Sequence, residues 1–184
     1  MMFCQRSSES ASLTTPTALM TWWNQVVLDQ DWIGGRVKTR ASSEFTNVDV
    51  QNSAGAAHAG YPVQAYDKHW GNLANYASLA MSGSWGDFHE LGHNHQRGWW
   101  NFGPDGEVTV NIFSNYNKET LASEPTTSGW GWSADPVQVI NTAVSNVAPG
   151  GTYVSKSSRW SFWFQLADGF GWDVYREVLM SYEL

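Results

Sequence analysis

The sequence predicts an α+β domain with a small N-terminal β-sheet, a central helix that carries a group of polar residues, and a mainly helical C-terminal part. Three observations support this class. Apolar residues recur at helical spacing after Thr15-Pro16, short extended segments dominate residues 36–67, and helical spacing returns from residue 72 onward. A chain of 184 residues with 42% hydrophobic residues has the size and apolar content of one domain.

The N-terminal part divides into a leader and the start of the domain. Residues 1–14 are rich in polar residues without periodicity, so we expect a flexible leader there and one domain over residues 15–184. Thr15 followed by Pro16 is typical of a helix start. The apolar stripe of this helix consists of Leu19, Trp22, Trp23, Val26 and Val27, and the helix ends at Gly34-Gly35.

A small sheet and two short helices are expected next. Extended segments are predicted at residues 36–39, 45–50 and 61–66, where β-forming residues are separated by small ones. A short helix is predicted at residues 72–80. A second helix begins near Asp87, a residue type suited to helix capping, after the Ser82-Gly83-Ser84 breaker.

The C-terminal part is predicted to be helical. One helix starts at Asp135-Pro136 and extends to Val147, and helical spacing covers residues 158–184 with a break at residues 169–171. Because this spacing still holds where the sequence stops at Leu184, we expect the domain to be truncated at its C-terminus.

Composition excludes several classes of function. The net charge is −7 and the 10 Lys and Arg residues are scattered, so the chain lacks the basic stripe that binds nucleic acid. The single cysteine, Cys4, cannot form an internal disulfide. No run of about 18 apolar residues is present, so we expect no membrane span, and no signal peptide is visible at the N-terminus.

The central motif is His89-Glu90-Leu91-Gly92-His93. Two histidines four residues apart lie on one face of a helix and reach one tetrahedral zinc ion. Bound zinc lowers the pKa of its water to about 7, and Glu90 is placed to take the water proton as a general base. Phe88 and Leu91 bury the other face of this helix, and Gly92 permits close approach of a neighbouring segment.

A catalytic zinc ion needs a third protein ligand, and Glu107 is the first candidate. The loop before it turns the chain back toward the two histidines, and Asp105 is suited to cap a helix that begins there. Val108, Val110 and Ile112 alternate as in a strand, but Val108, Ile112 and Tyr116 also share a helical face, and we expect a helix. The alternative ligands are His95, Asp105 and Glu119.

Several further side chains are expected around this site as substrate-contacting groups or as partners that orient the ligands. Tyr61, Tyr66 and Tyr116 are alternative sources of the hydroxyl that stabilises an oxyanion. Residues 57–62 are expected to form an edge strand or a structural turn, and an edge strand would pair with an extended peptide. The other candidates are His95, Gln96, Asn111, Trp99 and Trp100.

The motif and its flanks together resemble a known family. The matching blocks are Gly86-Asp87-Phe88-His89-Glu90-Leu91-Gly92-His93-Asn94-His95-Gln96, Glu107-Val108-Thr109-Val110-Asn111-Ile112-Phe113-Ser114 and Ala57-His58-Ala59-Gly60-Tyr61-Pro62. They are similar to the enhancin-like gluzincins, metallopeptidase family sixty, whose members include mucin-degrading peptidases.

This resemblance implies a zincin-like metallopeptidase domain with one Zn²⁺ per chain. The implied ligands are His89, His93 and a helical Glu107, and Glu90 is the implied catalytic residue. The resemblance also implies a substrate class, O-glycosylated proteins such as mucins, and a full-length protein that is secreted or at the cell surface.

Three alternatives to a peptidase are considered. A non-catalytic interaction protein is one, because animal relatives resembling channel-associated factors keep the fold while losing elements of the zinc motif. A glycan-binding module is suggested by the 12 tryptophans, several of them paired, although core filling explains them equally well. A zinc hydrolase acting on another amide or on an ester uses the same motif.

Overall fold

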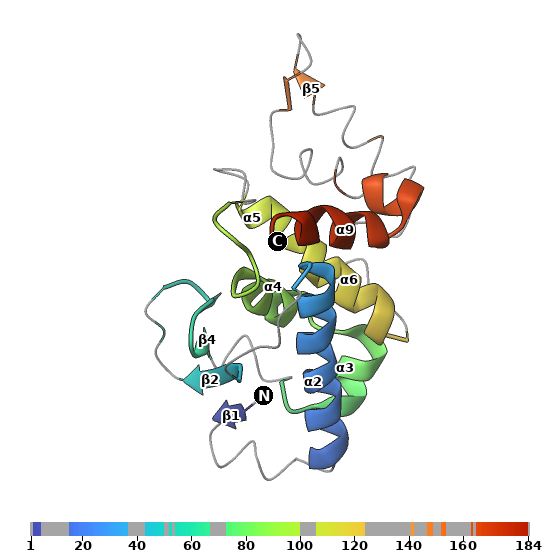
Figure 1. Cartoon of the computed structure of the whole chain (residues 1–184). Helices are drawn as coiled ribbons and strands as arrows, with labels where there is room; N and C mark the ends of the chain where they lie inside the picture. Colours follow the sequence, from blue (N-terminus) through green and yellow to red (C-terminus); the bar gives the residue numbers. More distant parts are fainter. Residues whose placement is uncertain are drawn as a thin grey trace.

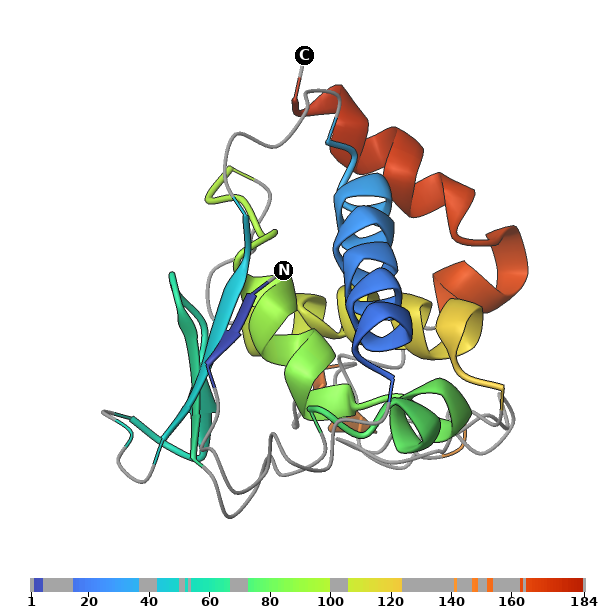
Figure 2. The same cartoon turned by 90° about the horizontal axis from the view of Figure 1, so that it is seen from below.

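The computed structural model has two layers, a small sheet on one side and a group of helices on the other (Figures 1 and 2). Both views place helix α4, Trp85–His93, between the sheet and the remaining helices. The α+β class predicted from the sequence is confirmed. The structure describes residues 2–4, 15–36, 43–49, 52, 54–66, 73–99, 106–123, 141, 147–148, 152–153, 163 and 165–183.

The sheet has four strands in the order β1-β2-β4-β3: Met2–Cys4, Phe45–Asp49, Val63–Tyr66 and, at the edge, Ala57–His58. The first three strands are parallel, and β3 pairs antiparallel with β4. The prediction of a leader is wrong for Met2–Cys4, because these residues pair with Phe45–Asn47. A three-residue strand is too short for periodicity to reveal, and only its distant partner defines it.

The helices with defined bounds in the described part of the chain are α2 Pro16–Ile33, α3 Tyr76–Ser82, α4 Trp85–His93, α5 Gly106–Thr109, α6 Asn111–Leu121 and α9 Asp173–Ser181. The predicted α2 is confirmed, and Pro16 occupies its first turn. The helix expected near Asp87 starts earlier, at Trp85, and Asp87 lies buried in its first turn rather than at the cap. The helix expected over Glu107 is also confirmed.

Two apolar clusters hold the helices together. One lies between the sheet, α2, α3 and α4, where Trp22 and Trp23 pack on Phe88 with ring centroids 5.7 and 6.2 Å from it. The other joins α6 to α9 and includes Ile112, Phe113 and Leu179. A Cβ atom at Gly92 would lie 3.0 Å from both Phe113 Cβ and Val110 Cγ2, so any larger residue there would require α6 to shift by a few tenths of an ångström.

The C-terminal part keeps the predicted break. Residues 165–170 are helical, Gly171 adopts a left-handed conformation with φ +80°, and α9 follows. The helix predicted to reach Val147 is wrong at its end, since Val147–Ala148 (β5) pairs with Thr152–Tyr153 (β6), and the rest of that helix falls outside the described residues except Asn141. No described helix is long and apolar enough to span a bilayer.

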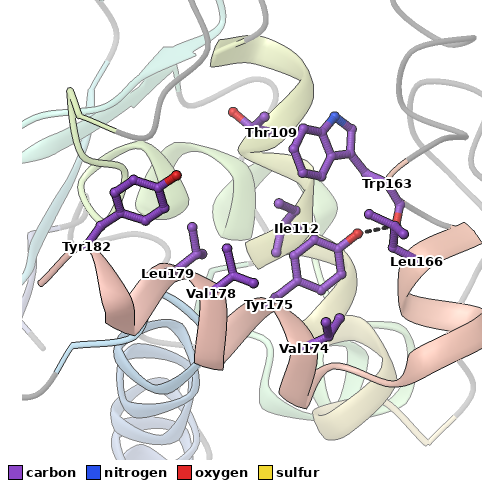
Figure 3. A pocket seen from close by; sticks show the side chains of 9 residues that line it. All are labelled: Thr109, Ile112, Trp163, Leu166, Val174, Tyr175, Val178, Leu179 and Tyr182. Carbon is purple, nitrogen blue, oxygen red and sulfur yellow. Dashed lines mark hydrogen bonds between the residues drawn. The ribbon is translucent and has the colours of Figure 1, made fainter.

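An apolar pocket of about 150 Å³ lies between α6 and α9 (Figure 3). Ile112, Val174 and Leu179 form much of its wall, and the Tyr175 hydroxyl donates a hydrogen bond to the carbonyl oxygen of Trp163. Burial raises the pKa of Tyr175, so this hydroxyl keeps its proton and acts as a donor.

Candidate metal centre

His89, His93 and Glu107 converge from two helices. One ligand atom from each of the three lies within 4.8 Å of the other two. His89 Nε2 is 3.2 Å from Glu107 Oε2, and His93 Nε2 is 3.6 Å from Glu107 Oε1. The rings of His89 and His93 are perpendicular, with centroids 4.8 Å apart, as expected for residues four apart on α4. The structure thus brings together the three side chains that were predicted from the sequence as ligands.

Asn111 fixes the tautomer of His89. The Asn111 amide nitrogen donates to the Glu107 carbonyl oxygen at 3.0 Å, and this bond defines which way the amide faces. Its Oδ1 therefore accepts from the indole nitrogen of Trp85 at 2.8 Å and from His89 Nδ1 at 3.3 Å. His89 carries its proton on Nδ1, and its Nε2 lone pair points at Glu107.

Gln96 does the same for His93. The Gln96 amide nitrogen donates to the Gly106 carbonyl oxygen at 2.8 Å and to the Thr109 hydroxyl at 2.9 Å. Its Oε1 consequently faces His93 Nδ1, 2.7 Å away, and accepts the proton of that nitrogen. This bridge also ties the end of α4 to α5, the helix that carries Glu107. The Nε2 atoms of both imidazoles therefore face the Glu107 carboxylate.

The donor set fits a divalent cation of the zinc type. Two neutral imidazoles and one carboxylate are ligands that Zn²⁺ accepts in catalytic sites. Burial, followed by the neighbouring His93, lowers the pKa of His89, while Asn111 and Glu107 act in the opposite direction. A neutral His89 has its Nε2 lone pair against carboxylate oxygens, a repulsive arrangement that a cation between them converts into attraction.

Glu90 lies beside this group, on the face of α4 that looks toward the sheet edge. Its carboxylate lies close enough to the backbone of Ala59, the residue that follows β3, for that backbone to lower its pKa. Burial raises the pKa of Glu90, and the charge of Glu107 raises it further. His93, the Ala59 backbone and His58 lower the pKa of Glu90. A half-buried carboxylate with a raised pKa is a suitable proton acceptor near neutral pH.

Two side chains proposed as groups around the site have other roles. His95 is buried, donates from Nδ1 to the Leu91 carbonyl oxygen at 2.9 Å and places Nε2 3.3 Å from Asp31 Oδ1, so it joins the ends of α4 and α2. It points away from the ligands because two positions after His93 correspond to about 200° of helix rotation.

Tyr116 is also misplaced by the sequence reasoning. Its ring stacks on Trp32 at 5.2 Å and packs edge-on against Trp172 at 5.6 Å. Burial, together with the charges of Asp29 and Asp173, raises its pKa to about 12. Five positions separate Tyr116 from Asn111, so the two lie about 140° apart around α6 and face different neighbours.

The other candidates divide into exposed, engaged and undescribed residues. Tyr61 and Trp99 are exposed, at 58% and 60%, and remain available to a ligand, while Tyr66 ends β4. Glu119 accepts a hydrogen bond from the Trp172 indole nitrogen at 2.7 Å, near the far end of α6. Asp105 and Trp100 lie outside the described residues.

Sequence reasoning missed Trp85 and Thr109. Trp85 packs on His89 with ring centroids 4.5 Å apart and shares the Asn111 oxygen with it. Trp85 lies four residues before His89, but the helix start predicted near Asp87 left it outside the helix, so this spacing was not used. Thr109 was hidden because its contact with Gln96 depends on how α5 folds back onto the end of α4.

The fold matches a solved structure. A conserved protein of unknown function from Bacillus anthracis aligns with 99% of this chain and 39% of its own length, with a TM-score of 0.81 at 19% sequence identity. A mutant of the same protein gives a TM-score of 0.80. At this identity the match supports the fold alone.

Curated relatives and a family profile complete the comparison. A TRPM8 channel-associated factor homolog from Xenopus laevis is 29% identical over 179 residues, and TRPM8 channel-associated factor 2 from Homo sapiens is 27% identical over 181 residues. Each alignment covers 94% of this chain and 19% of the relative, so the chain spans about a fifth of those proteins. The profile described as peptidase M60, enhancin and enhancin-like, matches residues 2–184. The chain therefore belongs to the enhancin-like peptidase M60 family.

Proposed function

We propose that the chain is a zinc-dependent peptidase domain of the zincin-like class, in which His89, His93 and Glu107 hold one Zn²⁺ and Glu90 is the general base. The observation that carries the proposal is the convergence of the three ligand atoms within 4.8 Å, with both Nδ1 protons already engaged. Zinc held there supplies Lewis-acid activation of water and of the scissile carbonyl group.

The residues of the chain provide the proton transfer. Glu90 accepts a proton from the attacking water and delivers it to the leaving amine, a role that its position next to His89 and its raised pKa support. Asn111 and Gln96 keep both imidazoles neutral at the ligating nitrogen, which metal binding requires.

The sheet edge supports an extended peptide as the substrate. Ala56 accepts a hydrogen bond from the Tyr66 amide at 2.8 Å, and Ala57 and His58 pair with Ala65 and Gln64. Bonded and non-bonded pairs alternate in an antiparallel ladder, so the amide and carbonyl of Ala57 point to the outer side of β3. A substrate strand added there would lie along the face of α4 that carries Glu90.

The substrate class is proposed from the family. Mucin-type O-glycosylated proteins fit the resemblance, and the exposed rings of Tyr61 and Trp99 are suited to stacking on sugars. Substrates of this class are extracellular, so the full-length protein is proposed to act as a secreted or cell-surface enzyme.

A non-catalytic interaction role is the second candidate. The names of the curated relatives describe association with the TRPM8 channel, and those proteins are 27–29% identical to this chain. A non-catalytic role would not need the zinc-binding and catalytic side chains. This chain nevertheless keeps all four of them: His89, His93, Glu107 and Glu90.

The first experiment measures metal and turnover together. We expect about one zinc ion per chain by elemental analysis, loss of zinc in His93→Ala, and full zinc in Glu90→Gln with hydrolysis reduced by about 10²- to 10⁴-fold. O-glycosylated proteins and their enzymatically deglycosylated forms serve as paired substrates. Absence of zinc in the wild-type chain would favour the interaction role, and turnover by Glu90→Gln would reject Glu90 as the base.

A further inference from the structure

Asn94 is a side chain that the mechanism does not use, although it joins three elements at the edge of the site. It directly follows His93 and keeps helical backbone angles, φ −67° and ψ −18°, at the end of α4. Its Oδ1 accepts from the Gly60 amide at 3.0 Å, and its Nδ2 donates to the Gly60 carbonyl oxygen at 2.9 Å. The second Nδ2 proton goes to Glu44 Oε2 at 2.9 Å.

These three bonds use the side-chain amide fully. Both of its protons are donated and its oxygen accepts, so the group behaves like a backbone peptide that pairs with both sides of Gly60. Glu44, which is 1% exposed, directly precedes β2 and holds the amide from the other side. Asn94 is therefore fixed in orientation, and through it the position of Gly60 relative to α4 is fixed.

Glu90 and Asn94 contact neighbouring residues of the segment that follows β3. They lie four apart on one face of α4, and their partners, Ala59 and Gly60, are consecutive. The Ala59 backbone lies close enough to the Glu90 carboxylate to lower its pKa, while Gly60 is hydrogen-bonded to Asn94. The two contacts therefore fall on adjacent residues of one segment, so a shift at one contact displaces the other.

We propose that Asn94 is a positioning residue that sets the register between the edge segment and Glu90. The segment after β3 is then docked on α4 by two adjacent contacts, one structural at Gly60 and one on the catalytic carboxylate at Ala59. Because β3 is also the strand on which an extended substrate would pair, the same clamp aligns substrate with base. This last step rests on the proposed peptidase function, whereas the clamp itself does not.

The test combines amide hydrogen exchange with steady-state kinetics on the zinc-loaded chain. In Asn94→Ala we expect exchange at the Ala59 and Gly60 amides to rise by at least about tenfold, while the Leu79 amide, bonded to the Asn75 carbonyl oxygen in α3, stays protected. Zinc content should be unchanged, and kcat should fall by about 10- to 100-fold, because small misplacements of a catalytic group have effects of this size.

Two further variants separate positioning from general stability. Asn94→Asp keeps the acceptor for the Gly60 amide but loses both donors and faces the Glu44 carboxyl, so it should reproduce the exchange and kcat changes. Asn52→Ala removes hydrogen bonds to the Ala54 and Gly55 carbonyl oxygens in the loop before β3, neither of which involves α4, so it should leave both readouts near wild type.

The possible outcomes are distinct. Unchanged exchange at Ala59 in folded Asn94→Ala and Asn94→Asp overturns the clamp, as does an equal rise at Ala59, Gly60 and Leu79, which indicates only a less stable fold. If the wild-type chain shows no peptidase activity, the proposed function fails, yet the exchange measurement still decides whether Asn94 holds the segment on Glu90.

Discussion

The candidate metal centre and the apolar pocket share the helix pair α5–α6 but are held together in different ways. Glu107 and Asn111 serve the ligand group, whereas Thr109 and Ile112, on other faces of the same helices, line the pocket. At the centre each imidazole is oriented by a directional hydrogen bond. In the pocket, contacts come mainly from apolar side chains of α6 and α9 (Figure 3).

This difference predicts where a mutation acts first. Loss of one polar atom at the centre removes orientation or charge, so metal affinity should change before the fold does. Loss of a methyl group in the pocket region removes packing, so stability should change while the ligands keep their geometry. Thr109 connects the two regions, since its hydroxyl accepts from Gln96 and its side chain borders the pocket.

The largest effect is expected from Glu107→Ala. Removing a charged ligand should weaken zinc binding by more than about 100-fold, which exceeds the usual effect of losing an outer partner. Competition titration against a chromophoric chelator measures this affinity. Glu119→Ala is the matched control, because Glu119 lies on the same helix pair and bonds Trp172 instead. Equal losses in both variants would remove Glu107 from the ligand set.

Leu179→Ala tests the packed region. Leu179 is 5% exposed and borders an existing cavity, so the free energy of unfolding should fall by about 2–3 kcal/mol, near the low end for such truncations. Zinc affinity of the folded protein should remain unchanged. Val178→Ala, at a half-exposed neighbouring position, is the control. It should lower the free energy of unfolding by less, as measured by chemical denaturation. A parallel loss of zinc affinity would show that the two regions are not independent.

Asn111→Leu tests how ligand orientation contributes to affinity. The change leaves the protons of His89 Nδ1 and the Trp85 indole without their acceptor, so zinc affinity should fall by about 10- to 100-fold. Asn117→Leu is the control on the same helix, because its amide bonds Gln30 and the Val26 carbonyl oxygen. That variant should lose stability and retain affinity when folded. The reverse pattern contradicts the assignment of Asn111.

Asp87→Asn should give the smallest effect and a pH signature. Burial raises the pKa of Asp87 well above its usual value. A hydrogen bond with Ser84 lowers this pKa, and the charge of Glu90 raises it. A raised folded-state pKa means that stability is highest at low pH and decreases as pH rises through that pKa. In metal-free protein at pH 8, the Tm of Asp87→Asn should therefore be higher than that of the wild type. The expected rise is about 2–4 °C for each kcal/mol added to the free energy of unfolding. At pH 4 the gain should shrink, and a constant difference at both pH values contradicts this origin.

Local patterns predicted the helices and the ligand group because those features depend on nearby residues. Helix α2 follows from Pro16 and its apolar spacing, and His89 and His93 share a face because the spacing is four. Val108 and Ile112 nevertheless lie in α5 and α6, and Val110 joins these helices with helical backbone angles. All three are buried in a cluster that includes residues of α2 and α9, so tertiary packing overrides strand propensity.

Contacts across long separations were not predictable from the sequence. The parallel pairing of Met2–Cys4 with Phe45–Asn47 joins segments about 40 residues apart, and the Asn94–Glu44 bond joins residues 50 apart. Neither leaves a periodic signal. The burial of Trp22 and Trp23 agrees with core filling, whereas Trp99, exposed at 60%, remains open to a binding role.

The packing of Gly92 bears on how such motifs are found in genomes. A scan for two histidines four apart treats the residues between them as free, yet a Cβ atom at position 92 would lie only 3.0 Å from Phe113 Cβ and Val110 Cγ2. In this chain, glycine before the second histidine is therefore favoured by the close crossing of α4 and α6, for reasons of packing and not of catalysis.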